Sequence, residues 1–345
     1  MSGPSILFVA DAGPTVGGGH VMRSLTLAQA LEAAGADCRF AAAPAAAALL
    51  ADFGPETELV AAASTSPQDL TQAVAGQRFD AVVFDHYGLS ASDHEAMAKG
   101  RVALAIDDLA DRALMADLVL DSGPARRAQD YDGLVPETAR LLLGPHYAPV
   151  RPAFAELRDG ALGRRGGEGV GRVLVSLGLT DVGGVTERVL ERLRPKIGSA
   201  GLDVVLGAEA PSLAALTRIA RRDDRMALHV AIPDMAWLCA NADIAVGAAG
   251  SSAWERCVLG LPSLMVILAD NQREAAQALA EREAALVVDA ADPGFDAAFD
   301  LALMRLLTDP GLRRRLNAAS AEVCDGLGAP RVAEAFLKLI AARKG

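Results

Sequence analysis

A histidine follows three consecutive glycines at positions 17–19, where one predicted element ends and another begins. The apolar run at residues 6–10 is typical of a buried strand in a parallel sheet, and residues 21–34 have the apolar spacing of a helix. At the helix start, His20 would lie beside exposed N–H groups and the positive end of the helix dipole, which keep an imidazole neutral. A neutral imidazole accepts protons, so we interpret His20 as a general base whose pKa the helix terminus lowers. The structural alternative is a side chain that only caps the turn.

The glycines themselves are predicted to bring the backbone close to a ligand, because glycine has no side chain. We therefore take Gly17 and Gly19 as ligand-binding positions. The same two glycines match the first two of a dinucleotide-binding fingerprint, but Met22 stands where the third should be. A long side chain there would prevent close packing of the helix on the strand, so this interpretation is the least favoured.

Polar side chains follow two further apolar runs, at residues 81–84 and 102–106. Asp85, His86 and Tyr87 follow the first run, and Asp107 and Asp108 follow the second. Ligands in open α/β sheets bind at the carboxyl ends of strands, so both groups are candidates for a binding site. The pattern favours a site role for the denser group at 85–87, whereas a helix cap explains either of the two later aspartates equally well.

A second succession of strand, glycine-rich turn and helix is predicted at residues 246–256. Backbone N–H groups and hydroxyls at Gly250, Ser251 and Ser252 are suited to holding a phosphate. Glu255 lies in the first turns of the helix, where its carboxylate could accept hydrogen bonds from the two hydroxyls of a ribose. Its structural alternative is a carboxylate that caps the helix or interacts with the helix dipole.

Two more loops are candidates for binding. The loop after the strand predicted at 172–177 contains Thr180 and Asp181, and we interpret it as a second anion-binding loop facing the same cleft. Asn271 and Gln272 follow the strand predicted at 263–268. Side-chain amides both donate and accept, which suits sugar hydroxyls and amides, although Asp270 or Asn271 would serve equally as a helix N-cap.

These candidate residues require two sheets to position them. Strands are predicted at 6–10, 38–41, 81–84, 102–106 and 118–120, and again at 172–177, 202–206, 227–230, 244–246 and 263–268. The stretch 160–171 contains six glycines and no periodicity, which is typical of a linker. We therefore predict an α/β protein with two Rossmann-like, doubly wound domains over 1–159 and 172–329. A C-terminal helix at 330–345 is a candidate to pack back on the first domain.

Length and composition agree with this organisation and restrict the partners. A chain of 345 residues exceeds what one hydrophobic core usually serves, and its net charge of −11 disfavours nucleic acid or an anionic membrane as partner. No leader or membrane-spanning segment is predicted, so we expect a cytoplasmic protein. The four cysteines lack the spacing of a metal site and are expected to be buried, reduced thiols: Cys38, Cys239, Cys257 and Cys324.

Five segments are informative together: the glycine-histidine stretch at 17–23, the Asp-His-Tyr group at 85–87, the loop at 180–181, and the stretches 250–257 and 268–272. Together they resemble the PseG-type UDP-sugar hydrolases of pseudaminic acid biosynthesis, over nearly the whole chain. The resemblance implies the GT-B architecture of MurG, in which two Rossmann-like domains face a cleft. It also implies hydrolysis of UDP-2,4-diacetamido-2,4,6-trideoxy-β-L-altropyranose, the free sugar then feeding a pathway that modifies flagellin or surface polysaccharide.

The same resemblance assigns roles to individual residues. It makes His20 the catalytic histidine, adds Tyr87 as a second catalytic residue that faces the sugar, and gives Glu255 to the uridine ribose. The diphosphate turn falls on Gly250, Ser251 and Ser252, and sugar-side polar groups fall on Asn271 and Gln272. Three positions depart from the family's pattern, which commonly has Arg at Val9 and Gly at Leu179 and Ala249.

The implied mechanism is a single displacement in which His20 deprotonates a water that attacks the anomeric carbon, with inversion. UDP is a good leaving group and the chain has no DxD-like motif, so neither a metal nor another cofactor is expected. Three alternatives stay open: a UDP-sugar glycosyltransferase on the same fold, a hydrolase of a related UDP-diacetamido sugar, and a protein that only binds a nucleotide sugar. Release of UDP without an acceptor separates the hydrolases from the other two.

Overall fold

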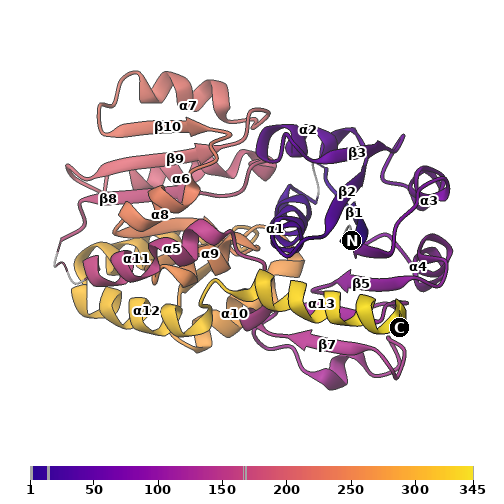
Figure 1. Ribbon diagram of the computed structural model, residues 1–345. Coiled ribbons are helices and arrows are strands. Elements are labelled where there is room, and N and C mark those ends of the chain that lie inside the picture. Colours follow the sequence, from indigo (N-terminus) through magenta and orange to yellow (C-terminus); the bar gives the residue numbers. More distant parts are fainter. Residues whose placement is uncertain (1–2, 14–15, 166, 168, 345) are drawn as a thin grey trace. The chain divides into compact units, whose positions relative to one another are not determined.

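The computed structural model of the protein describes residues 3–13, 16–165, 167 and 169–344. The chain forms two compact units: unit 1 contains Met1–Val150 and Leu327–Gly345, and unit 2 contains Arg151–Gly326. Each unit is a parallel sheet covered by helices, as the alternation of apolar runs and helical stretches predicts (Figure 1).

The sheet of unit 1 has the order β3-β2-β1-β4-β5-β6-β7 among the described residues, and its strands are parallel. Its strands are β1 (Ser5–Ala10), β2 (Asp37–Ala42), β3 (Glu58–Ala61), β4 (Ala81–Asp85), β5 (Val102–Ile106), β6 (Leu118–Asp121) and β7 (Arg140–Leu143). Its helices are α1 (Gly19–Ala33), α2 (Pro44–Phe53), α3 (Pro67–Ala75), α4 (Ala91–Ala98) and α13 (Gly328–Lys344), with short 3₁₀ turns at η1 (Ala128–Tyr131) and η2 (Pro145–Tyr147). The strand order reverses between β1 and β4, so the loops that follow these two strands form the topological switch point where such sheets bind ligands.

The sheet of unit 2 has the order β10-β9-β8-β11-β12-β13, again parallel, with its switch point between β8 and β11. Its strands are β8 (Arg172–Ser176), β9 (Gly201–Leu206), β10 (Met226–Val230), β11 (Ile244–Ala248), β12 (Ser263–Ile267) and β13 (Leu286–Asp289). Its helices are α5 (Pro152–Arg164), α6 (Val185–Leu193), α7 (Leu213–Ala220), α8 (Met235–Asn241), α9 (Ser252–Val258), α10 (Arg273–Glu281), α11 (Phe295–Thr308) and α12 (Pro310–Val323), with 3₁₀ turns at η3 (Val182–Gly184) and η4 (Asp270–Gln272).

Strand β1 explains why unit 1 has a hydrophobic core on each face of its sheet. Ile6 and Phe8 belong to one buried cluster, and Leu7 and Val9 belong to the other, because successive side chains of a strand point to opposite faces. Val9 therefore fills the core. The C-terminal helix α13 completes the first cluster with Phe336 and packs against α1, so the end of the chain belongs to unit 1 (Figure 1).

Three strands of the described residues were not predicted from the sequence, and all three lie at sheet edges. They are β3 and β7 of unit 1 and β13 of unit 2. An edge strand has a neighbour on one side only and exposes more of its side chains, so its apolar run is short. In β3, for example, three of the four side chains are exposed. The ten strands predicted from apolar runs are all present, with ends that differ by at most two residues.

The boundary between the units differs from the expected one. It falls at Val150 and Arg151, and residues 160–164 of the expected linker continue helix α5. Arg158 and Arg164 of this helix, and Arg165 directly after it, hold α5 to unit 2 through backbone carbonyls near helix ends. These carbonyls belong to Cys239, Ala240 and Ala242 at the end of α8, to Val258 and Leu259 at the end of α9, and to Ala321 and Cys324 at the end of α12. Guanidinium groups satisfy carbonyls that a helix end leaves without partners, so α5 is part of unit 2 rather than a flexible connection.

Candidate active site

His20 lies at the switch point of unit 1, in the first turn of α1, with its imidazole buried. Its Nδ1 atom lies 3.2 Å from the backbone oxygen of Asp85 and 3.3 Å from the Oδ1 atom of the same residue. Both neighbours are acceptors, so in the neutral ring Nδ1 carries the proton and donates it to Asp85. The other nitrogen, Nε2, has no hydrogen-bond partner among the described residues and holds the lone pair that a general base needs.

Asp85 is the partner of His20 rather than a ligand-facing residue. Its carboxylate is fully buried, and Arg23 donates to both of its oxygens, from Nε to Oδ2 at 2.7 Å and from Nη2 to Oδ1 at 2.6 Å. The hydroxyl of Ser24 donates a further hydrogen bond to Oδ2 at 3.1 Å. These contacts hold the carboxylate behind the imidazole, which corrects the expectation that Asp85 binds substrate directly.

Tyr87 and Asp108 complete the surroundings of His20. The rings of Tyr87 and His20 meet edge to face with their centroids 4.4 Å apart. The Tyr87 hydroxyl donates to Oδ1 of Asp108 at 2.6 Å, and Nη1 of Arg23 donates to Oδ2 of Asp108 at 2.9 Å. Of the two aspartates left open by the sequence, Asp108 therefore joins the group around His20.

The environment lowers the pKa of His20, as expected, but for a different main reason. Burial is the largest cause because it disfavours the charged imidazolium, and Arg23 adds to the lowering. Asp85 acts in the opposite direction and raises the pKa. Burial of His20 depends on the packing of the whole unit and could not be inferred from its position in the sequence, which indicated only the helix terminus.

Two neighbours of this group have structural roles. His86 donates from Nε2 to the backbone oxygen of Thr65 at 3.0 Å and accepts at Nδ1 from the N–H of Gly88. Asp107 is buried and accepts hydrogen bonds from Arg112, from the hydroxyl of Tyr131 and from the N–H group that follows at residue 110. Their polar atoms are thus engaged in holding the loops after β4 and β5.

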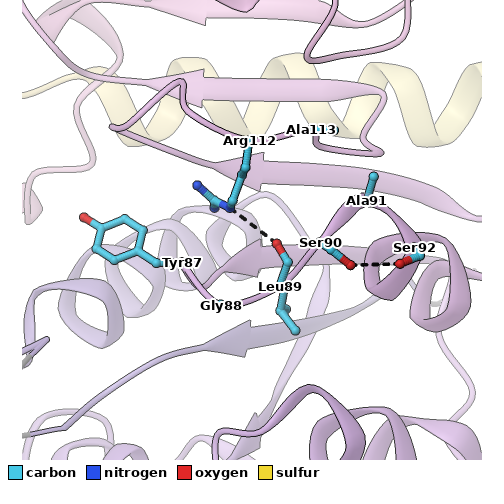
Figure 2. A pocket seen from close by; sticks show the side chains of 8 residues that line it. All are labelled: Tyr87, Gly88, Leu89, Ser90, Ala91, Ser92, Arg112 and Ala113. Atoms are coloured by element: carbon cyan, nitrogen blue, oxygen red, sulfur yellow. Dashed lines mark hydrogen bonds between the residues drawn. The ribbon is translucent and has the colours of Figure 1, made fainter.

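A hollow of about 470 Å³ adjoins Tyr87 (Figure 2). Its lining residues are Tyr87, Gly88, Leu89, Ser90, Ala91, Ser92, Arg112 and Ala113. Arg112 crosses it: the guanidinium donates to the backbone oxygen of Leu89, and its carbon lies 5.9 Å from the centre of the Tyr87 ring. Arg112 was not among the predicted site residues, because the contact of this side chain with Tyr87 depends on how the loop after β5 folds.

The glycine loop before His20 is tight. Gly17 has a φ of 78°, a left-handed conformation that favours glycine, and it exchanges backbone hydrogen bonds with Gly13. Gly19 is the first residue of α1. Residues 14 and 15 of the predicted loop lie outside the described residues.

At the switch point of unit 2, the turn Gly250-Ser251-Ser252 leads from β11 into α9. The buried Arg256 donates to the backbone oxygen of Ala248 at 2.6 Å and to the Ser252 hydroxyl oxygen at 3.1 Å, which ties the turn to its helix. Gln272 accepts a hydrogen bond from the N–H of Leu268, and its amide nitrogen faces Gly250.

Glu255 is held by an arginine from the start of unit 2. Its Oε1 atom accepts from Nε of Arg151 at 2.9 Å and lies 2.8 Å from Nη2 of the same side chain. Among the described residues Glu255 makes no capping hydrogen bond and contacts Arg151 instead, whereas its place in the first turn of α9 agrees with the alternative of an interaction with the helix dipole. The carboxylate thus has one oxygen engaged with a cation, and it is partly exposed.

The loop after β8 is built differently from the expectation. The carboxylate of Asp181 is buried and accepts from the N–H and hydroxyl of Thr186 and from the N–H of Ser212, so it fastens the loop instead of facing a ligand. Leu179 contacts Gly207 through its backbone: its oxygen accepts from the Gly207 N–H at 3.0 Å. Thr180 is partly exposed in this loop.

Asn271 and Ala249 are the remaining candidate positions in unit 2. Asn271 is exposed in η4, and Ala249 is buried beside β12, where its N–H donates a hydrogen bond to the backbone oxygen of Val266. The four cysteines are buried and free of disulfides, and burial raises the pKa of Cys239 and of Cys257 to about 12. Among the described residues, no cluster of three or more His, Cys, Asp or Glu side chains could hold a metal ion, and no helix is long and apolar enough to cross a bilayer.

Comparison with known proteins finds relatives that are similar in sequence. No protein-family model matches the chain. It is 25% identical over 281 residues to the UDP-2,4-diacetamido-2,4,6-trideoxy-β-L-altropyranose hydrolase of Campylobacter jejuni, covering 80% of this chain and 96% of that enzyme. It is also 27% identical over 195 residues to the spore coat polysaccharide biosynthesis protein SpsG of Bacillus subtilis, covering 56% and 57% of the two chains.

Solved structures agree on the architecture. MurG of Acinetobacter baumannii has a TM-score of 0.66 at 16% identity, covering 97% of this chain and 99% of that one. The spinosyn forosaminyltransferase SpnP has a TM-score of 0.63 at 17% identity, covering 98% and 99%. The fold is that of GT-B glycosyltransferases. The fold class predicted from the sequence is therefore confirmed, as is the resemblance to the altropyranose hydrolase.

Proposed function

We propose that this protein is an enzyme that processes UDP-sugars, and more specifically that it hydrolyses UDP-2,4-diacetamido-2,4,6-trideoxy-β-L-altropyranose to UDP and the free sugar. The observation that carries the proposal is His20, whose Nδ1 proton is held by Asp85 while Nε2 is left to accept a proton. The likeness to the Campylobacter jejuni hydrolase extends over 96% of that enzyme and supports the choice of substrate. The free sugar would serve pseudaminic acid biosynthesis in the cytoplasm, for flagellin or a surface glycan.

The proposed reaction is one displacement at the anomeric carbon. Nε2 of His20 takes a proton from water while the water oxygen forms a bond to the carbon. The bond from that carbon to the β-phosphate oxygen breaks, and its electron pair leaves with UDP. Because attack and departure occur on opposite faces, the configuration at the anomeric carbon inverts.

The surroundings of His20 suit this transfer. Burial keeps the imidazole neutral and ready to accept a proton, whereas Asp85 stabilises the imidazolium that forms. A positioned general base contributes a factor of roughly 10² to 10⁴ in rate. Asp85 thus supports the base instead of touching the substrate.

Unit 2 would hold the nucleotide. Backbone N–H groups of Gly250, Ser251 and Ser252 at the start of α9 are suited to the diphosphate. Glu255, oriented by Arg151 through Oε1, has Oε2 for the ribose hydroxyls. Thr180, Asn271 and Gln272 are proposed as further polar contacts to the substrate, and Gly17 and Gly19 as the backbone approach from unit 1.

A glycosyltransferase is the second candidate, because the solved structures of this fold include sugar transferases such as SpnP. The same base would then deprotonate an acceptor hydroxyl, and the hollow beside Tyr87 and Arg112 offers space for one. Acceptor-free turnover distinguishes the two reactions.

The test is ³¹P NMR of the purified protein with the UDP-sugar, without acceptor, beside the variant His20→Asn. We expect the wild type to release UDP and the variant to be slower by roughly 10² to 10⁴, with UDP affinity by calorimetry unchanged. Full turnover by the variant would exclude His20 as the base. Binding without release by the wild type would exclude hydrolysis of this sugar and favour a transferase or a binding protein.

A further inference from the structure

His20 and four side chains around it form a closed circuit of contacts, which we name the Arg23 circuit. Asp85 contacts His20, and Arg23 bridges Asp85 and Asp108. Asp108 accepts a hydrogen bond from Tyr87, and the ring of Tyr87 contacts the imidazole of His20 edge to face. Its members come from α1, from the end of β4 and from the loops after β4 and β5. A closed circuit restrains each member from two sides, so a change at Asp108 reaches His20 by two routes.

The charges of the circuit favour proton uptake. With neutral His20 and Tyr87, the two carboxylates and one guanidinium leave one net negative charge, and protonation of His20 brings the sum to zero. Arg23 and Tyr87 together hold the pKa of Asp108 below its usual range even though burial would raise it, so this carboxylate stays charged. The side chain of Asp108 is 26% exposed, whereas that of Asp85 is buried.

We propose that Asp108 is a positioning residue for the base His20, acting through the Tyr87 ring and through the charge balance at Arg23. This inference rests on the proposed function of His20. Because the Tyr87 hydroxyl is committed to Asp108 at 2.6 Å, Tyr87 acts as the wall that orients the imidazole and not as a proton donor to the substrate. The role proposed for Tyr87 thus changes from catalytic to positioning.

The first variant is Asp108→Asn, which keeps an oxygen for the Tyr87 hydroxyl and removes the charge. Its matched control is Asp111→Asn, on the same loop and with the same change of charge, because Asp111 is 59% exposed and pairs with Arg112 outside the circuit. NMR of the histidine ring protons without substrate gives the pKa of His20, whose signal is assigned by its loss in His20→Asn. We expect the pKa of His20 to fall by about one pH unit in Asp108→Asn and to stay unchanged in Asp111→Asn.

The second readout is kinetic. We expect Asp108→Asn to lower kcat roughly tenfold and to move the acid limb of the pH profile to lower pH, with KM little changed. Tyr87→Phe keeps the ring against His20 and removes only the hydroxyl. Since the two residues share one route, the double variant should lose less activity than the product of the two single losses.

The results separate this inference from the proposed function. An unchanged pKa of His20 in Asp108→Asn, or losses that multiply in the double variant, would overturn the positioning role. Absence of UDP release by the wild type would defeat the hydrolase proposal, and the ring-proton titration, which uses no substrate, would still decide whether Asp108 controls His20.

Discussion

The topological switch points of the two units differ in the chemical groups that form them. In unit 1, the start of α1, the end of β4 and the loop after β5 bring together a histidine, two aspartates and an arginine, most of them buried. In unit 2, the loops after β8 and β11 contain glycine, serine and backbone groups, and the buried carboxylate of Asp181 is hydrogen-bonded to Thr186 of α6 and to the N–H of Ser212. The same sheet topology thus holds a cluster of charged side chains in one unit and a turn of glycine, serine and backbone groups in the other.

Charged side chains in unit 1 and backbone N–H groups in unit 2 have different physical properties. Charged side chains in low-polarity surroundings interact strongly and shift each other's pKa, which suits a base. N–H groups at a helix start bind an anion without a titrating group, so this contribution to affinity does not depend on the protonation of a side chain. Unit 1 should therefore be sensitive to the loss of a single charge, and unit 2 to the addition of a single methyl group.

The largest effect is expected from Arg23→Met. This change leaves Asp85 buried without its cation, and breaking a buried ion pair costs about 3–5 kcal/mol. Arg39→Met is the control within unit 1, because the partners of Arg39, Asp37 and Glu58, are 63% and 62% exposed, and such surface pairs contribute about 1 kcal/mol or less. The free energy of unfolding in urea measures both. Equal losses would contradict the view that the charges of the switch point in unit 1 are structurally tied together.

Protonation of His94 at acid pH should lower the stability of unit 1. This residue of α4 is 1% exposed and stacks on Phe84, and neither ring nitrogen has a hydrogen-bond partner in the part of the chain that the structure describes. Burial lowers its pKa to about 4. The unfolded chain takes up a proton near pH 6.5, whereas the folded chain does so only near its lowered pKa, so stability falls as the pH drops between the two values. The loss between pH 7 and 5 is about 2 kcal/mol.

His94→Leu removes this titration and provides the comparison. Unfolding in urea at pH 7 and at pH 5 should show a smaller loss in the variant than in the wild type, by about 2 kcal/mol. The same loss in both proteins would mean that the imidazole of His94 is not held neutral by burial.

How far the sequence predicts this arrangement depends on the range of the interactions. Local patterns were sufficient to place His20 at the start of a helix, because the strand, the glycines and the helix are adjacent in the chain. They were also sufficient to predict the central strands, whose apolar runs are long. Arg23 pairs with Asp85 across 62 residues and with Asp108 across 85, so nothing in the local pattern selects these partners. The loop that contains Asp181 was interpreted as an anion-binding loop, and the contact of its carboxylate with the N–H of Ser212, 31 residues away, could not be read from the local pattern.

In unit 2, Gly250→Ala should weaken nucleotide binding without affecting the fold. A Cβ at this position would lie 3.5 Å from the amide nitrogen of Gln272, an ordinary contact, so the methyl group would obstruct the ligand and not the protein. We expect the Kd for UDP by calorimetry to rise about tenfold, about 1.4 kcal/mol, with an unchanged Tm. Gly76→Ala, where an added Cβ meets nothing within 4 Å, is the control. Unchanged UDP affinity in Gly250→Ala would remove this turn from the binding site.

The smallest effect is expected at Arg151, and it tests whether any side-chain charge matters to binding in unit 2. Arg151→Met frees Oε1 of Glu255 and lets the carboxylate rotate, so the Kd for UDP should rise about fivefold, about 1 kcal/mol. Arg225→Met removes an arginine paired with Asp223 in the same unit and should leave UDP affinity unchanged. If Arg151 acts by orienting Glu255, its loss should have no further effect in a Glu255→Gln background. Additive losses would instead show that Arg151 contacts the nucleotide itself, and the contrast between a charge-based and a backbone-based switch point would then be weaker than the structure suggests.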